Sequence, residues 1–143
     1  MYNTILVAVD FSSGPDAVVQ KAVDVAKGCD AAVHLVHVVE DHSHVYDILM
    51  MPPEMGFDSL EIHKKHMASL IELAAKFDVR PDHCHIEQAS TGAGIVTAAK
   101  RVNADLMVAG THGRHGISLL LMGSTADNLL HHSDIDLLAV RVG

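Results

Sequence analysis

Short aliphatic runs alternate along the chain with stretches in which apolar residues recur at helical spacing. The first run, Ile5–Val9, is apolar at every position, as expected of a parallel strand buried on both faces. Further strands are predicted at 32–39, 83–89, 106–109 and 137–142. Helices are predicted between them, at 15–27, 58–77, 91–102 and 126–132. This β-α-β alternation predicts one α/β domain over residues 1–143, with a parallel sheet covered by helices on both faces.

Local signals also predict where the helices begin and end. The stretch Ser12-Ser13-Gly14, followed by Pro15, is expected to supply the cap of the first helix, and Gly28 is expected to stop it. Asp58 is expected to cap the second helix, with Glu61 three positions later. The apolar stripe of that second helix is predicted to comprise Leu60, Met67, Ile71, Ala74 and Phe77.

The stretch from 40 to 57 shows no clear period and contains Pro52-Pro53. Loops of this length are uncommon in compact domains and often form lids or contact surfaces. Its methionines and Phe57 favour a lid or an interface over a solvated linker.

A glycine-containing stretch follows the fourth predicted strand. Glycines at 110, 113, 116 and 123 allow backbone N–H groups to approach an anion closely, because no Cβ intervenes. Ser124 and Thr125 follow the last of them, just before a predicted helix whose N-terminus favours negative charge. Arg114 adds a cation. Ligands of parallel sheets bind at the carboxyl ends of strands, so this stretch and Asp10, which follows the first strand, predict a phosphate site.

Composition excludes several classes of function. Ten basic residues against eighteen acidic ones give a net charge of −8, which argues against a nucleic-acid-binding surface. The two cysteines, Cys29 and Cys84, are too few for a disulfide framework and are expected to be reduced, buried thiols. The N-terminus lacks the features of a signal peptide, and no apolar run is long enough to span a bilayer. We therefore expect a cytoplasmic protein.

The spacing of the glycines resembles that of the nucleotide-binding branch of the universal stress protein family, Gly-x2-Gly-x9-Gly-Ser/Thr. Here Gly110 and Gly113 enclose two residues, nine residues separate Gly113 from Gly123, and Ser124 follows. The order of Asp10, the second strand and the glycine stretch is also similar to the family, across essentially the whole chain. The resemblance implies a flavodoxin-like (Rossmann-like) strand order of 3-2-1-4-5, an ATP site and a regulatory role in the stress response.

The resemblance also implies roles for individual residues. Asp10 would face adenine, Val38 would offer backbone contacts to the base, and Gly110 would lie by the ribose. The complete set that it assigns to ATP is Ala8, Asp10, Val38, Gly110, Thr111, Gly113, Arg114, Gly123, Ser124 and Thr125. Mg²⁺ is the expected counter-ion, because the loop contains a single arginine. The family typically forms homodimers through its last strand, here 137–142.

Alternatives to a nucleotide sensor are less well supported by the residues. A nucleotidyl transferase or ATP pyrophosphatase of related fold would carry a histidine or serine-rich loop after the first strand, where this chain reads Asp10-Phe11-Ser12. A phosphoacceptor receiver domain would need acids clustered beside Asp10. No P-loop lysine and no activated nucleophile stand out, so we expect slow hydrolysis at most. The close histidine pairs, such as His63 and His66 or His83 and His85, are expected to be structural or on the surface rather than metal ligands.

Overall fold

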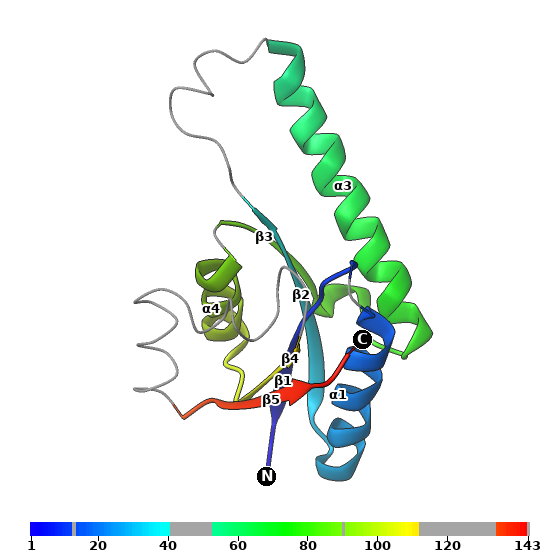
Figure 1. The fold of residues 1–143 in the computed structure, drawn as a ribbon, viewed down its shortest axis with the longest axis vertical. Coiled ribbons are helices and arrows are strands. Elements are labelled where there is room, and N and C mark those ends of the chain that lie inside the picture. Colours follow the sequence, from blue (N-terminus) through cyan, green and yellow to red (C-terminus); the bar gives the residue numbers. More distant parts are fainter. Residues whose placement is uncertain (13, 41–52, 90, 112–133, 143) are drawn as a thin grey trace.

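The computed structural model describes residues 1–12, 14–40, 53–89, 91–111 and 134–142. Its strands form one sheet, in which every pairing is parallel and the order is β3-β2-β1-β4-β5 (Figure 1). The strands are β1 (Thr4–Ala8), β2 (Ala32–Glu40), β3 (Cys84–Ala89), β4 (Leu106–Gly110) and β5 (Asp136–Val140). The predicted α/β class and strand order are confirmed.

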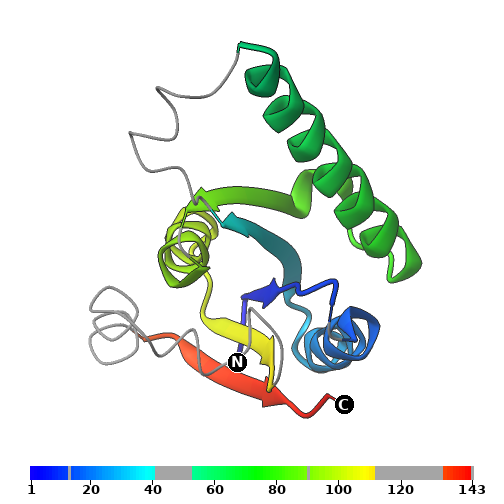
Figure 2. The same cartoon turned by 45° about the horizontal axis from the view of Figure 1, so that its top comes forward.

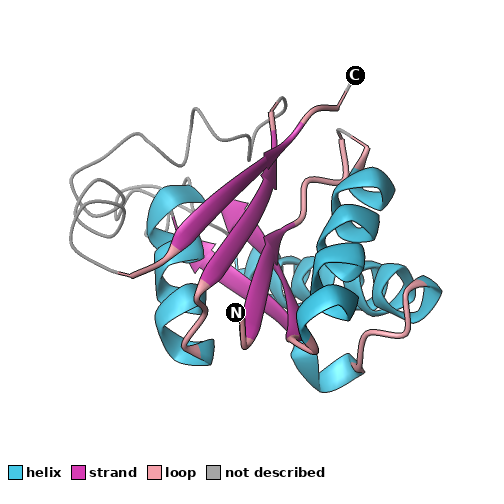
Figure 3. Ribbon diagram, turned by 90° about the horizontal axis from the view of Figure 1, so that it is seen from below, coloured by secondary structure: helices cyan, strands magenta, loops and turns pink. Residues whose placement is uncertain are grey.

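Helices lie on both faces of the sheet (Figure 3). They are α1 (Pro15–Cys29), α3 (Pro53–Lys76) and α4 (Thr91–Val102), with a short 3-10 helix η1 (Pro81–His83) before β3. The helices α1 and α3 cover one face and α4 covers the other, and a separate hydrophobic cluster fills each interface. In β1, alternate residues serve the two clusters: Ile5 and Val7 face α1 and α3, whereas Leu6 and Ala8 face α4. Burial on both faces explains why the strand is apolar throughout.

The N-cap of α1 lies in the predicted stretch, whereas the end of the helix differs from the prediction. Gly14, with φ of 58°, is the N-cap and makes no side-chain hydrogen bond, so Ser12 does not cap the helix. The helix continues through Gly28, where an added Cβ would meet no atom within 4 Å. Asp30 takes the left-handed conformation that ends the helix, with φ of 56°, and donates its backbone N–H to the carbonyl of Ala26. The prediction that Gly28 stops the helix is therefore wrong.

Helix α3 begins at Pro53, earlier than predicted. Proline fixes φ near the helical value and loses no hydrogen bond in the first turn, so it starts this helix instead of marking a loop. Asp58 consequently lies inside α3 and is not its N-cap. Of the predicted lid, residue 40 belongs to β2 and 53–57 belong to α3. The remainder, 41–52, lies outside the described residues.

The amino-terminal part of α3 extends past the sheet (Figures 1 and 2), which changes the predicted apolar stripe. Leu60 is 62% exposed and does not belong to the core. Leu70, Leu73 and Ala74 are buried, because only the carboxyl-terminal part of the helix packs against the strands. Two leucines that the stripe omitted therefore anchor the helix.

The remaining described elements agree with the sequence in type, but some bounds differ: β5 covers Asp136–Val140 instead of 137–142, and His83 belongs to η1 instead of β3. The edge position of β3 is confirmed, and α4 begins at Thr91 as predicted. Alternate residues of β5 face opposite sides, with Val140 in the α1–α3 cluster and Leu137 packed against the α4 cluster. The helix predicted at 126–132 lies outside the described residues. No helix of the described ranges combines the length and the apolar character needed to cross a membrane.

Candidate functional site

The strand order reverses between β1 and β4: successive strands are added on one side of β1 up to β3, and on its other side from β4 onward. Strands β2 and β3 lie on one side of β1, and β4 lies on the other, with Val7 in register with Val108. The carboxyl ends of β1 and β4 therefore lie next to each other, at the point where the strand order reverses. In parallel α/β sheets, ligands bind at such a switch point, outside the carboxyl ends of the strands.

Five of the ten predicted site residues are described, and the fold brings all five to this edge. Ala8 ends β1 and Asp10 follows it, Val38 lies near the end of β2, and Gly110 ends β4 before Thr111. The other predicted residues, in the glycine stretch and the helix start beyond it, lie outside the described residues: Gly113, Arg114, Gly123, Ser124 and Thr125.

The carboxylate of Asp10 is oriented by Ser12. Its Oδ1 accepts hydrogen bonds from the backbone N–H of Ser12 at 2.9 Å and from the Ser12 hydroxyl at 2.6 Å. These bonds fold the chain after β1 into an Asx turn. Ser12, which belongs to the stretch predicted to cap α1, instead fixes the acidic group at the candidate site.

Thr111 connects the end of β4 to the strand beside it. Its backbone N–H donates to the carbonyl of Val140 at 2.9 Å, and its hydroxyl oxygen accepts from the N–H of Val142 at 3.3 Å. Thr111, which follows the first glycine of the stretch, is thus tied to the end of β5. The start of that stretch is held by the sheet on its β5 side.

Val38 is closed off by helix α4. The side chain is 3% exposed, and a Cβ added at Gly94 would lie 2.8 Å and 2.9 Å from its two γ-carbons. Only glycine lets the helix approach this closely. Any contact that Val38 makes with a ligand must therefore use its backbone.

His37 is a residue of this edge that the sequence did not single out for a role in binding. It is 7% exposed, and its Nδ1 lies 3.0 Å from the carbonyl oxygen of Val9. Its ring meets Phe11 edge-on at a centroid distance of 4.9 Å and stacks on His66 of α3 at 4.9 Å. A histidine in an aliphatic strand was visible in the sequence, but the partners that define its role come from distant segments.

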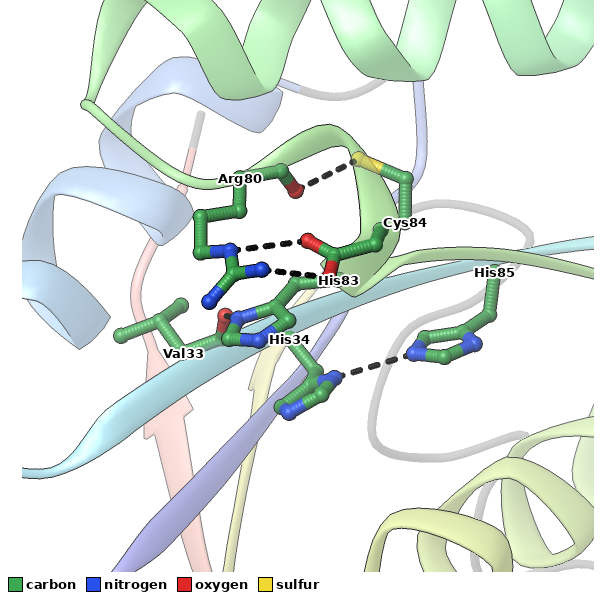
Figure 4. Close-up of polar contacts among 7 residues, drawn as sticks. Val33, His34, Arg80, His83, Cys84 and His85 are labelled. Atoms are coloured by element: carbon green, nitrogen blue, oxygen red, sulfur yellow. Dashed lines mark hydrogen bonds and ion pairs between the residues drawn. The ribbon is translucent and has the colours of Figure 1, made fainter.

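A second histidine group lies on the opposite face of β2 (Figure 4). His34 Nδ1 is 3.0 Å from His85 Nε2, and the His34 ring stacks on His83 at a centroid distance of 3.9 Å. Burial, and then the neighbouring imidazoles, lower the pKa of His34 to about 4. Burial also lowers the pKa of His85, followed by the effect of Arg101. Both shifts favour neutral rings.

The described residues contain no cluster of three or more histidine, cysteine or acidic side chains arranged to hold a metal ion. The predicted pair His63 and His66 separates, because His63 is exposed while His66 turns toward His37. The cysteines are free, with Cys84 buried and Cys29 only half-buried. Burial raises the pKa of Cys84 to about 11, so this thiol is a packing group rather than a nucleophile.

A cavity of about 460 Å³ lies at the opposite, amino edge of the sheet, between the ends of α1 and α3. Two of its cations face carboxylates, since Arg80 pairs with Asp82 at 2.8 Å and Lys76 lies 3.8 Å from Asp16. A volume of this size is large enough for a small ligand. The carboxyl edge fits an anionic nucleotide better, because the glycine stretch begins there.

Comparison with known proteins agrees with the fold. The model of the Universal stress protein family matches residues 1–141. Universal stress protein A homolog 2 of Coxiella burnetii is 35% identical over 99% of this chain and 96% of its own length. Among solved structures, universal stress protein UspA from Lactobacillus plantarum has a TM-score of 0.67 at 21% identity, covering 98% of each chain.

A universal stress protein solved in complex with cAMP has a TM-score of 0.58 at 20% identity, covering 98% of this chain and 97% of its own. At these identities the solved structures show a shared fold. The family match and the Coxiella relative extend over nearly the whole sequence. The chain therefore belongs to the universal stress protein family.

Proposed function

We propose that this protein binds ATP at the carboxyl edge of β1, β2 and β4 and acts as a nucleotide-dependent regulatory protein. The observation that carries the proposal is the adjacency of β1 and β4, which puts Asp10 and Gly110 on either side of the switch point. One ligand that binds between them could contact the fixed carboxylate with one end and the start of the glycine stretch with the other. That separation suits a nucleotide, with a polar base at one end and phosphates at the other.

The charge of Asp10 decides the orientation of the nucleotide. A carboxylate next to a triphosphate would be repulsive, whereas beside the base or sugar it can accept from an amino or hydroxyl group. We therefore assign Asp10 and the backbone of Val38 to adenine. Gly113, Arg114, Gly123, Ser124 and Thr125 are proposed to hold the phosphates, with Mg²⁺ neutralising the charge that Arg114 leaves.

Two further observations support this assignment. Ala8 and Val38 lie at or near the ends of neighbouring strands with their side chains nearly fully buried, so this edge offers their backbone groups to a base. One protein of the same fold is solved with cAMP, which contains adenine and phosphate. The described part of the edge contains Asp10 but no activated nucleophile, so we propose slow hydrolysis at most.

A symmetric dimer through β5 is part of the proposal. This strand is at the edge of the sheet, and the N–H of Asp136 and the carbonyl of Val140 point toward β4. Backbone groups alternate along a strand, so those of Ala139 point away from β4, where a second copy could pair with them. Ala139→Pro should then shift sedimentation from dimer to monomer, and a wild-type monomer at micromolar concentration would contradict the dimer.

The test of nucleotide binding begins with mass spectrometry of small molecules released from purified protein. ATP titration by calorimetry follows, on wild type and on Gly113→Val and Gly123→Val. Gly28→Val is the matched control, because a Cβ at Gly28 meets open space in α1. We expect the loop variants to lose binding and the control to retain it. Unchanged affinity in both loop variants would contradict the phosphate assignment.

A further inference from the structure

The imidazole of His37 contacts the chain on both sides of Asp10. Its Nδ1 lies 3.0 Å from the carbonyl oxygen of Val9, and its ring meets the Phe11 ring edge-on at an interplanar angle of 63°. A carbonyl oxygen only accepts hydrogen bonds, so Nδ1 must carry the proton and donate it. One side chain thus engages the residue before Asp10 and the residue after it.

The imidazole is held from its other side by α3. His66 stacks on it at a centroid distance of 4.9 Å and an interplanar angle of 26°. The register partner of His37 in β3 is Ile86, which packs against the α1–α3 cluster, so His37 projects from that same face. With a ring partner on α3 and an exposed fraction of 7%, the imidazole has little freedom to leave the Val9 carbonyl.

We propose that His37 is a positioning residue for the base end of the nucleotide site, which it serves by holding the turn that presents Asp10. The inference rests on the proposed function, because it takes Asp10 as the group that faces the base. Ser12 fixes the Asp10 carboxylate within the turn, and His37 fixes the turn against the sheet. Together they set where a base must lie to reach the carboxylate. His37 acts through Asp10 and does not itself contact the ligand.

Two substitutions separate the hydrogen bond from the ring. His37→Asn keeps an N–H donor at the position of Nδ1, because the two nitrogens are the same number of bonds from the backbone. His37→Phe keeps a ring between Phe11 and His66 but removes the donor. A purely space-filling role for His37 predicts that Phe is the better replacement, whereas the positioning role predicts that Asn is.

Calorimetric titration with ATP, GTP and tripolyphosphate, each with Mg²⁺, distinguishes these outcomes. We expect His37→Phe to bind ATP about tenfold more weakly and to lose any preference for ATP over GTP, while His37→Asn stays within about threefold of wild type. Tripolyphosphate has no base, so wild type and His37→Phe should bind it equally. An ATP preference that persists unchanged in His37→Phe overturns the positioning role and leaves the proposed function intact.

If wild type binds neither ATP nor GTP, the proposed function fails and this inference fails with it. NMR of the protein without nucleotide tests the structural step separately. We expect His37 as the Nδ1–H tautomer, and faster amide exchange at Phe11 and Ser12 in His37→Phe but not in His37→Asn. The Nε2–H tautomer in wild type would overturn the inference. Because this measurement uses the wild-type protein, it does not depend on whether a variant folds.

Discussion

Strand β2 carries a histidine on each of its faces, and the two histidines have different roles. His34 faces the α4 side, in register with Leu6, and lies among two other imidazoles at the start of the strand. His37 faces the α3 side near the end of the strand, and its Nδ1–H donates a hydrogen bond to the carbonyl oxygen of Val9. The same residue type is thus a charge-sensitive packing group in one place and a fixed donor in the other. The difference comes from the three-residue spacing, which is odd and so alternates faces.

The two faces also differ in how closely a helix approaches β2. On the α4 face Gly94 lies against Val38, whereas on the α3 face the ring of His66 fills the space beside His37. Close backbone packing on one face leaves no room for a side chain, and ring stacking on the other requires one. Substitutions on the two faces should therefore have effects of different size and origin.

Gly94→Ala is expected to have the largest effect. The added methyl group would overlap the γ-carbons of Val38, and overpacking of this kind costs about 1–3 kcal/mol in the free energy of unfolding. Urea denaturation measures the change. Gly28→Ala is the matched control, because the same substitution meets open space there and should stabilise the protein by up to about 1 kcal/mol. Equal effects at both positions would contradict the close approach of α4.

The second-largest effect is expected from acidification, which should lower the free energy of unfolding through His34 on the α4 face. Above pH 6.5 His34 is neutral in both the folded and the unfolded chain, so its pKa shift has no effect on stability. As the pH falls from 6.5 toward 4, the unfolded chain binds a proton that the folded His34 does not, and the free energy of unfolding falls. Because the ring is only half-buried, we expect a loss on the order of 1–2 kcal/mol.

The contribution of His34 can be isolated by comparing wild type with His34→Gln at pH 7 and pH 5. The glutamine variant should lose less stability over this interval than wild type does. A parallel decline in the two proteins would show that other groups cause the acid sensitivity and that the imidazole stack does not.

His66→Ala is expected to have the smallest effect, on the α3 face. Removing the stacked ring should lower the free energy of unfolding by about 0.5–1.5 kcal/mol, the usual worth of an aromatic pair. His63→Ala on the same helix is the control: His63 is exposed, so its loss should change stability by less than about 0.5 kcal/mol. Thermal melts at pH 7.5 compare the two variants. If His63→Ala destabilised the protein as much as His66→Ala does, the stacking of His66 on His37 would make no specific contribution to stability.

The fold was predictable because its signals are local and redundant. A parallel sheet buried on both faces needs strands that are apolar throughout, and Ile5–Val9 has that pattern regardless of its neighbours. The helix ends were less predictable. Whether Gly28 stops α1 or is carried within it depends on what surrounds it, and Pro53 can mark a loop or begin a helix.

The candidate site was predictable only in part. The position of Asp10 and Gly110 follows from strand order, so the sequence could place them at one edge. The role of Ser12 as the partner of Asp10 was not foreseen, because it competes with helix capping for the same residue type. The contacts of His37 with Val9 and with α3 join segments distant in sequence, and no pattern within one element reveals them.

The most direct test of the account is amide chemical-shift mapping of ¹⁵N-labelled protein titrated with Mg²⁺-ATP. Among the residues that the structure describes, we predict the largest chemical-shift changes at the carboxyl edge, at Asp10, Val38, Gly110 and Thr111. Shifts centred on the cavity at the amino edge, around Lys27, would contradict the proposed site, as would the absence of any saturable change.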